Sequence, residues 1–251
     1  MTTLAIKTNS GVRVVEMNRP DSLNALNPQM MDELAEIFIS TASDDEIKVI
    51  VLTGAGRAFS AGADLAASRD YTPKHGLAGM IDAMVDFPKP FIAAVNGLGV
   101  GYGATVCGLA DFVIMSDKGR LRAPFSALGL TAELSSTYTF PRLMGRQRAS
   151  WFLLAAEWLD ANACLEAGLT MEVVPSDQLM TRTDEQADKL AKLPLASLVK
   201  TKQLIMDPLR AQMKASVIAE NDGLAELRGG PANKEAVSAF LEKRDPDFAS
   251  I

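Results

Sequence analysis

The chain has 251 residues, of which 48% are hydrophobic and 22% charged, and its net charge is −6 at pH 7. This balance is typical of one large globular domain and argues against disorder, repeat arrays and nucleic-acid binding through bulk positive charge. The two cysteines form no spaced pair, and His75 is the single histidine, so neither a disulfide framework nor a metal site is indicated. We expect any acid–base chemistry to use carboxylates, Lys, Tyr or backbone dipoles.

Strands and helices alternate through the first three-quarters of the chain. Strands are expected at 4–7 and 12–17 around a turn at Asn9-Ser10-Gly11, and Asn27 caps a helix that has Pro28 at its first position. The other expected elements are buried strands at 47–53, 91–95, 112–115 and 171–174 and helices at 77–85, 146–157 and 160–168. The alternation predicts an α/β fold with largely buried parallel strands.

After residue 178 the strand signal disappears. Residues 178–251 are predicted to be helical, with breaks near Pro194, Pro208 and Gly229-Gly230-Pro231. We expect a core over residues 1–192 and a helical C-terminal region over 193–251, which packs on this core or on another subunit.

Two glycine-rich junctions follow predicted buried strands. The first extends from Thr53 to Gly62, and the second extends from Gly97 to Ala104. Such a turn, where it leads into a helix, exposes unpaired backbone N–H groups at the positive end of the helix dipole. Two turns that face one point would form an oxyanion hole, a pair of donors for a carbonyl oxygen that gains negative charge. Close packing is the alternative explanation of these glycines.

Two other interpretations of the second junction are less consistent with the sequence. Gly99-x-Gly101-x-x-Ala104 matches a dinucleotide fingerprint, but only about eight residues separate it from the next strand, too few for a crossover helix. The uncharged stretch from Phe91 to Ala110 has the length of a membrane span, but its five glycines disfavour insertion. Neither end of the chain resembles a targeting signal, so we expect a cytoplasmic protein without nucleic-acid or membrane partners.

Short segments along nearly the whole chain resemble the crotonase (enoyl-CoA hydratase/isomerase) superfamily in their order and spacing. These segments are Asn18-Arg19-Pro20, Asn24-Ala25-Leu26, Val51-Leu52-Thr53-Gly54, Phe59-Ser60-Ala61-Gly62-Ala63-Asp64-Leu65, Pro88-Lys89-Pro90, Ala94-Val95-Asn96-Gly97, Ala110-Asp111, Ala167-Gly168-Leu169, Val173-Val174-Pro175 and Ala239-Phe240-Leu241-Glu242-Lys243-Arg244. The resemblance implies a spiral of ββα units with a C-terminal helical region that completes the CoA site and supports a homotrimer or a dimer of trimers. It also implies an acyl-CoA thioester substrate, with no further cofactor and no metal.

The resemblance implies positions for the two oxyanion donors. The first is the backbone N–H of Ala63, directly after Gly62, and the second is the backbone N–H of Tyr102, inside the second glycine turn. Both positions agree with the oxyanion-hole interpretation of the glycine junctions.

The same resemblance implies CoA contacts. Ala61, Asp64 and Leu65 match the segment that binds CoA, and Asp64 is also expected to be a structural partner of this loop. Arg19 matches a position near the CoA phosphates, and Lys243 matches one that reaches CoA from a neighbouring subunit. Solvated side chains are the alternative for Asp64 and Lys243.

The chain departs from the hydratase pattern at both catalytic carboxylates. One hydratase Glu lies three residues beyond the second donor, where this chain has Thr105. The other follows a Pro, and here Pro124 is followed by Phe125. Because Thr and Phe have no useful acid–base pKa, ordinary activation of water for hydration is not expected.

Residues 123–145 instead resemble the branch that converts 3-enoyl-CoA to 2-enoyl-CoA. In that branch a single Glu, at the position of Glu133, moves the proton from C2 to C4. The branch has Pro-Glu-Gly where this chain has Ala132-Glu133-Leu134, so the turn that holds the Glu is expected to differ. A surface carboxylate that caps a helix is the alternative for Glu133. Other acyl-CoA reactions, such as hydration or hydrolysis, and a non-catalytic acyl-CoA-binding relative are the alternative functions.

Overall fold

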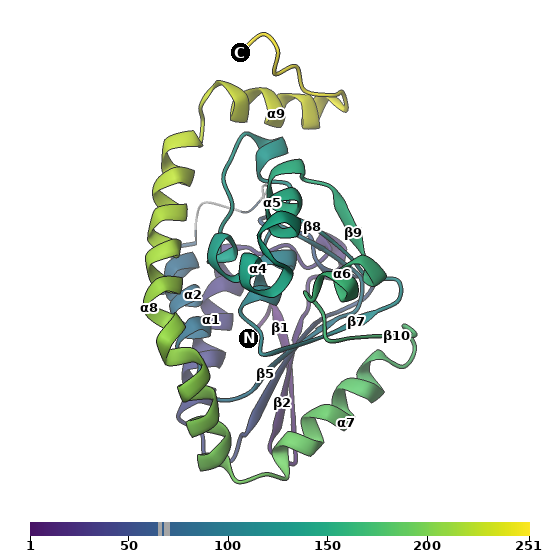
Figure 1. Ribbon diagram of the computed structural model, residues 1–251, viewed down its shortest axis with the longest axis vertical. Coiled ribbons are helices and arrows are strands. Elements are labelled where there is room, and N and C mark those ends of the chain that lie inside the picture. Colours follow the sequence, from purple (N-terminus) through teal and green to yellow (C-terminus); the bar gives the residue numbers. More distant parts are fainter. Residues whose placement is uncertain (65–66, 68–70) are drawn as a thin grey trace.

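The computed structural model describes residues 1–64, 67 and 71–251. A six-stranded sheet in the order β1-β2-β3-β5-β7-β10 forms its centre (Figure 1). The strands are β1 (Leu4–Asn9), β2 (Val12–Met17), β3 (Val49–Gly54), β5 (Phe91–Val95), β7 (Phe112–Ser116) and β10 (Glu172–Val174). β1 and β2 form the predicted antiparallel hairpin, and the other neighbours are parallel. Every residue of β3 and β5 is buried, which confirms the predicted buried parallel strands.

A second, four-stranded sheet has the order β4-β6-β8-β9. Its strands are β4 (Ala58–Ser60), β6 (Leu98–Val100), β8 (Arg120–Arg122) and β9 (Trp158–Asp160). β4, β6 and β8 each follow a strand of the main sheet, and they pair in parallel with one another. Each strand pair then leads into a helix, so the chain winds as the predicted spiral of ββα units.

Helices cover both faces of the main sheet. Those before the C-terminal region are α1 (Pro28–Ala42), α2 (Gly76–Val85), α3 (Tyr102–Thr105), α4 (Ser136–Met144), α5 (Arg146–Ala155), α6 (Ala161–Ala167) and α7 (Leu179–Ala191). Asn27 caps α1 as predicted, because its side chain accepts a hydrogen bond of 2.8 Å from the Met30 N–H. Ile50 and Leu52 of β3 pack with α1 and α2, whereas Val49 and Val51 pack with α7.

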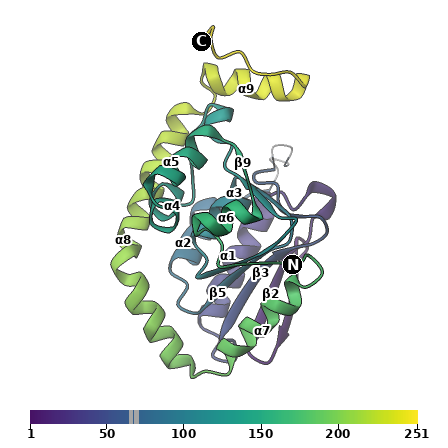
Figure 2. The same cartoon turned by 45° about the vertical axis from the view of Figure 1, so that its right-hand side comes forward.

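Two helices form the C-terminal region. α8 (Leu195–Leu227) runs along one side of the molecule, and α9 (Pro231–Glu242) lies across one end (Figures 1 and 2). The predicted break near Pro208 is wrong, because α8 continues through this residue. Pro208 is exposed, so the Leu204 carbonyl that loses its helical partner faces water and costs little.

Charged contacts on both sides of Pro208 fix α8 to the core. The Lys202 ammonium pairs with Asp111 at 2.6 Å and donates to the Lys89 carbonyl at 2.8 Å. Beyond the proline, the Lys214 ammonium pairs with Asp86 at 2.7 Å. These anchors hold both halves of the helix in line despite the missing hydrogen bond.

The uncharged stretch of residues 91–110 does not form a single helix. It comprises β5, β6, α3 and the 3-10 turn η2 (Val106–Gly108). Across the described helices, none combines the length and the apolar character needed to cross a bilayer.

Candidate functional site

The two glycine turns lie against each other. β4 and β6 are parallel neighbours, so the chain leaves both strands at the same end of the second sheet. Gly62 and Gly101 follow these strands with φ angles of +85° and +53°, a region that favours glycine. A Cβ on Gly62 would lie 2.8 Å from the Val100 carbonyl oxygen and 3.7 Å from the Gly101 Cα, so a side chain there would separate the turns.

The residues after these glycines carry backbone donors without a hydrogen-bond partner in the described structure. Gly62 O and Asp64 N both bond to the backbone of Leu26, and the N–H of Ala63 between them makes no hydrogen bond within the described residues. Tyr102 is the first residue of α3, and its N–H likewise has no partner in the described part of the chain. The structure therefore brings together the two turns that bear the predicted oxyanion donors.

Asn24 holds the first of these turns in place. It is fully buried with a φ of +56°, a conformation that Asn tolerates better than most residues. Its side-chain amide donates at 2.8 Å to the carbonyls of Ala55 and Ala58. The backbone carbonyl of Asn24 accepts from the Ser60 hydroxyl at 2.9 Å. The sequence marked Asn24 only as part of a resembling segment. These three hydrogen bonds span more than 30 positions, so no local pattern indicates this role.

Arg19 and Asp64, two of the predicted CoA contacts, form an ion pair at 2.8 Å. Arg19 also donates to the Ala25 carbonyl at 2.6 Å, so its guanidinium ties the loop after β2 to the glycine turn. Ala61 lies in the same turn, half-buried, with its N–H bonded to the Leu23 carbonyl. Leu65 lies outside the described residues.

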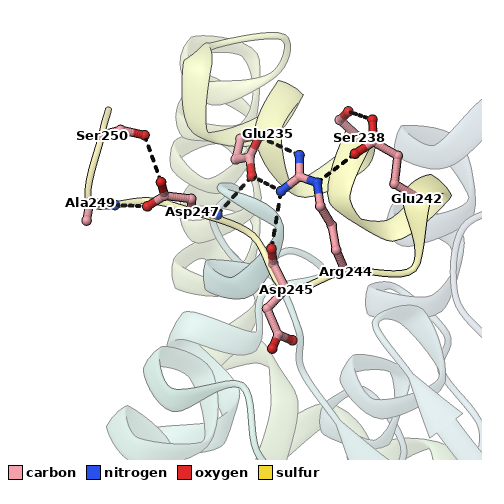
Figure 3. Close-up of polar contacts among 8 residues, drawn as sticks. All are labelled: Glu235, Ser238, Glu242, Arg244, Asp245, Asp247, Ala249 and Ser250. Atoms are coloured by element: carbon pink, nitrogen blue, oxygen red, sulfur yellow. Dashed lines mark hydrogen bonds and ion pairs between the residues drawn. The ribbon is translucent and has the colours of Figure 1, made fainter.

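Lys243 lies apart from these residues in the chain. It follows α9, is exposed, and has a φ of +56°. No hydrogen bond or ion pair within the described residues joins it to Arg19 or Asp64. The neighbouring Arg244 pairs with Glu235 at 2.5 Å and with Glu242 at 2.6 Å, which folds the C-terminal segment back on α9 (Figure 3).

Thr105 and Phe125, at the positions of the two hydratase carboxylates, are buried and contribute to the packing of the fold. The Thr105 hydroxyl is fully buried and donates to the Gly101 carbonyl at 3.2 Å, within its own turn of helix. Phe125 is also buried and belongs to the main apolar core. Neither side chain can exchange a proton with a substrate.

Glu133 is half-buried and directly precedes the turn into α4. The pKa of its carboxyl is raised to about 7, mainly by burial and also by the neighbouring Glu220, whereas Arg228 opposes the shift. Within the described residues its carboxylate has no hydrogen bond or ion pair. It therefore does not cap α4, which argues against the alternative of a helix-capping surface carboxylate.

The turn after Glu133 places two non-glycine residues in a region that favours glycine. Leu134 and Ser135 both have left-handed backbone conformations, with φ angles of +57° and +58°. A glycine adopts this conformation without cost, whereas each non-glycine residue pays about 1–2 kcal/mol. Leu134 is 1% exposed and packs in the core, which offsets part of that cost.

A cavity of about 660 Å³ lies elsewhere, between α8 and the edge of the core. Apolar residues such as Leu198 and Ile205 line it, and the ion pair of the buried Lys202 with the half-buried Asp111 lies at its wall. Neither Glu133 nor the two glycine turns line this cavity. It is therefore distinct from the candidate site.

Comparison with known proteins places this geometry in one family. The model of the enoyl-CoA hydratase/isomerase family matches residues 7–250. The chain belongs to this family, the crotonase superfamily. The crystal structure of an enoyl-CoA hydratase/isomerase from Pseudoalteromonas atlantica T6c superposes with a TM-score of 0.94 at 33% identity, over 98% of this chain and 99% of that one. The protein is therefore a crotonase-fold enzyme of a family that acts on acyl-CoA thioesters.

Relatives within the family are named for different reactions. The chain is 34% identical to a 1,2-epoxyphenylacetyl-CoA isomerase of Escherichia coli K12, over 95% of each chain. It is 32% identical to a 2,3-dehydroadipyl-CoA hydratase of the same organism, over 99% of each chain. It is 31% identical to an enoyl-CoA delta isomerase 2 of Rattus norvegicus, over 95% of this chain and 62% of that protein. These similar identities do not distinguish an isomerase from a hydratase, so the distinction depends on the residues of the site.

Proposed function

We propose that this crotonase moves the double bond of a 3-enoyl-CoA to the 2-position, with Glu133 as the single base. The observation that carries the proposal is a half-buried carboxylate that has no partner among the described residues and whose pKa is raised to about 7. Such a group exchanges protons in both directions near neutral pH. The absence of a carboxylate at Thr105 and Phe125 removes the groups that would activate water.

In the proposed mechanism the thioester oxygen accepts hydrogen bonds from the N–H groups of Ala63 and Tyr102. Glu133 takes the C2 proton, whose acidity is increased by both the carbonyl and the adjacent alkene. The resulting dienolate places negative charge on the thioester oxygen, where the two N–H donors stabilise it. Glu133 then returns the same proton to C4, so the double bond ends between C2 and C3 and no water is consumed. The scheme uses no metal and no cofactor beyond the CoA of the substrate.

The test uses 3-hexenoyl-CoA as substrate, with formation of 2-hexenoyl-CoA followed by absorbance of the conjugated thioester. We expect turnover by the native chain and a loss of at least about 100-fold in kcat for Glu133→Gln, because the amide cannot accept the proton. Full activity of the variant would refute the role of Glu133. 2-Hexenoyl-CoA is supplied in a parallel assay, and its hydration to 3-hydroxyhexanoyl-CoA without turnover of 3-hexenoyl-CoA would favour the hydratase alternative suggested by the relatives of that name.

The predicted CoA contacts and assembly belong to the same proposal. Arg19, Ala61, Asp64 and Leu65 would bind CoA on one subunit, and Lys243 of a neighbouring subunit would complete the site. Large exposed apolar side chains support self-association through the region of residues 193–251, including Leu204, Ile218 and Leu241, which are 70%, 63% and 74% exposed. We therefore propose a homotrimer or dimer of trimers, which light scattering after size exclusion would distinguish. The cytoplasmic location also stays a prediction.

A further inference from the structure

Glu220 of α8 accepts hydrogen bonds from the chain directly after Glu133. Its carboxylate is 4% exposed and accepts three hydrogen bonds from two residues of the α4 N-terminus. The Ser135 N–H donates to one oxygen at 2.7 Å. The N–H and the hydroxyl of Thr137 donate to the other oxygen, at 2.9 and 2.6 Å. Burial raises the pKa of the Glu220 carboxyl, and the hydrogen bonds from Thr137 and Ser135 oppose this shift because they favour the ionised form.

The segment that Glu220 holds is conformationally costly. Leu134 and Ser135 are both left-handed, so the backbone between Glu133 and α4 would relax if it were released. The Ser135 hydroxyl lies 2.8 Å from the Ser216 hydroxyl, which itself donates to the Met213 carbonyl, so the Ser135 hydroxyl donates to Ser216. α8 therefore contacts this turn at Ser216 and Glu220, one helical turn apart.

We infer that Glu220 is a positioning residue, which holds the turn after Glu133 in its left-handed form and aims the Glu133 carboxylate. The inference rests on the proposed role of Glu133 as the base. Position 220 is 87 residues from Glu133, and nothing in the resemblance that identifies the base assigns a role to it. The strain at Leu134 provides the reason: where a glycine would adopt the turn freely, this chain uses hydrogen bonds from a separate helix.

Glu220 also acts on Glu133 through its charge. Two charged groups in the described structure shift the pKa of Glu133: Glu220 of α8 favours the protonated carboxyl, and Arg228, directly after α8, favours the carboxylate. Removing the charge of Glu220 should therefore move the pH at which the base ionises toward lower values. A residue that merely stabilised the fold would not produce this shift.

The experiment compares pH profiles of kcat and KM for 3-hexenoyl-CoA in the native chain, Glu220→Gln and Glu226→Gln. Glu226 is an exposed carboxylate on the same helix, so its variant removes the same charge without touching the turn. We expect Glu220→Gln to lower kcat at pH 8 by about tenfold or more. The inflection that Glu133 gives to the pH profile of kcat should move by about one pH unit toward acid. KM should stay within about twofold, and the control should resemble the native chain. An unmoved inflection in Glu220→Gln would overturn the inference.

Two further measurements keep the inference testable. If Glu220→Gln does not fold, Thr137→Val removes one donor at an exposed position and should lower kcat severalfold, whereas Thr137→Ser keeps the hydroxyl and should retain the native rate. Equal rates for these two variants would overturn the inference. Carboxyl ¹³C NMR measures the titration of the Glu133 carboxyl in the absence of substrate, with its signal assigned from the spectrum of Glu133→Gln. A lower titration midpoint of Glu133 in Glu220→Gln would support the inference even if the native chain made no isomer. The absence of isomer would refute only the proposed function.

Discussion

The raised pKa of Glu133 predicts that its replacement by Gln stabilises the protein in a pH-dependent way. The pKa is about 7 in the folded chain, against an ordinary value of 4.5. Between these values the folded state binds more protons than the unfolded state, so stability falls as pH rises from about 4.5 through 7. Above pH 7 the charged carboxylate costs the folded state about 3 kcal/mol, at about 1.4 kcal/mol per pKa unit. Because Gln is neutral like the protonated carboxyl, the variant does not lose this folding free energy at high pH.

Urea unfolding of the native chain and Glu133→Gln at pH 5 and pH 8 measures this difference. At pH 8 the variant should be more stable by about 3 kcal/mol, and at pH 5 by about 1 kcal/mol or less. Glu226→Gln is the matched control, since this exposed carboxylate lies on α8 and should show a difference near zero at both values. Protein concentration is held constant because association contributes to stability. An equal difference for Glu133→Gln at the two pH values would refute the burial argument.

Other predictions concern the glycine turns and the anchor of α8. Gly62→Ala should lower kcat by about 100-fold, because a Cβ at 2.8 Å from the Val100 oxygen separates the two donors; kcat near the native value would contradict the convergence of the turns. Lys202→Met should destabilise the fold by about 3 kcal/mol in urea unfolding, because it leaves the half-buried Asp111 charge without its Lys partner. The double variant with Asp111→Asn should recover part of this loss, and a double variant no more stable than Lys202→Met would count against the charge explanation.

Much of the fold follows from local patterns in the sequence. The buried strands β3 and β5 appear as uninterrupted apolar runs, and Asn27-Pro28 marks the start of α1 because capping depends on neighbouring residues only. The glycine junctions indicated where unpaired N–H groups would occur. Glu133 as a candidate base came from the resemblance to the isomerase branch, and the proposed reaction depends on it.

Tertiary structure decided the features that depend on distant residues. The second sheet is built from three-residue strands, which are too short for a periodic pattern and exist only because β4, β6 and β8 pair with one another. α8 passes through Pro208 because charged contacts with the core hold both of its halves.

The same holds for the site itself. The glycine junctions are enough to predict the two donors, because turn chemistry depends on neighbouring positions, and the resemblance to the isomerase branch predicts the base. Only the tertiary structure placed Gly62 against Gly101 and brought Glu220 to the turn after Glu133. The proton affinity of Glu133 is raised by its burial and by a charge 87 residues away, and neither quantity exists until the chain is folded.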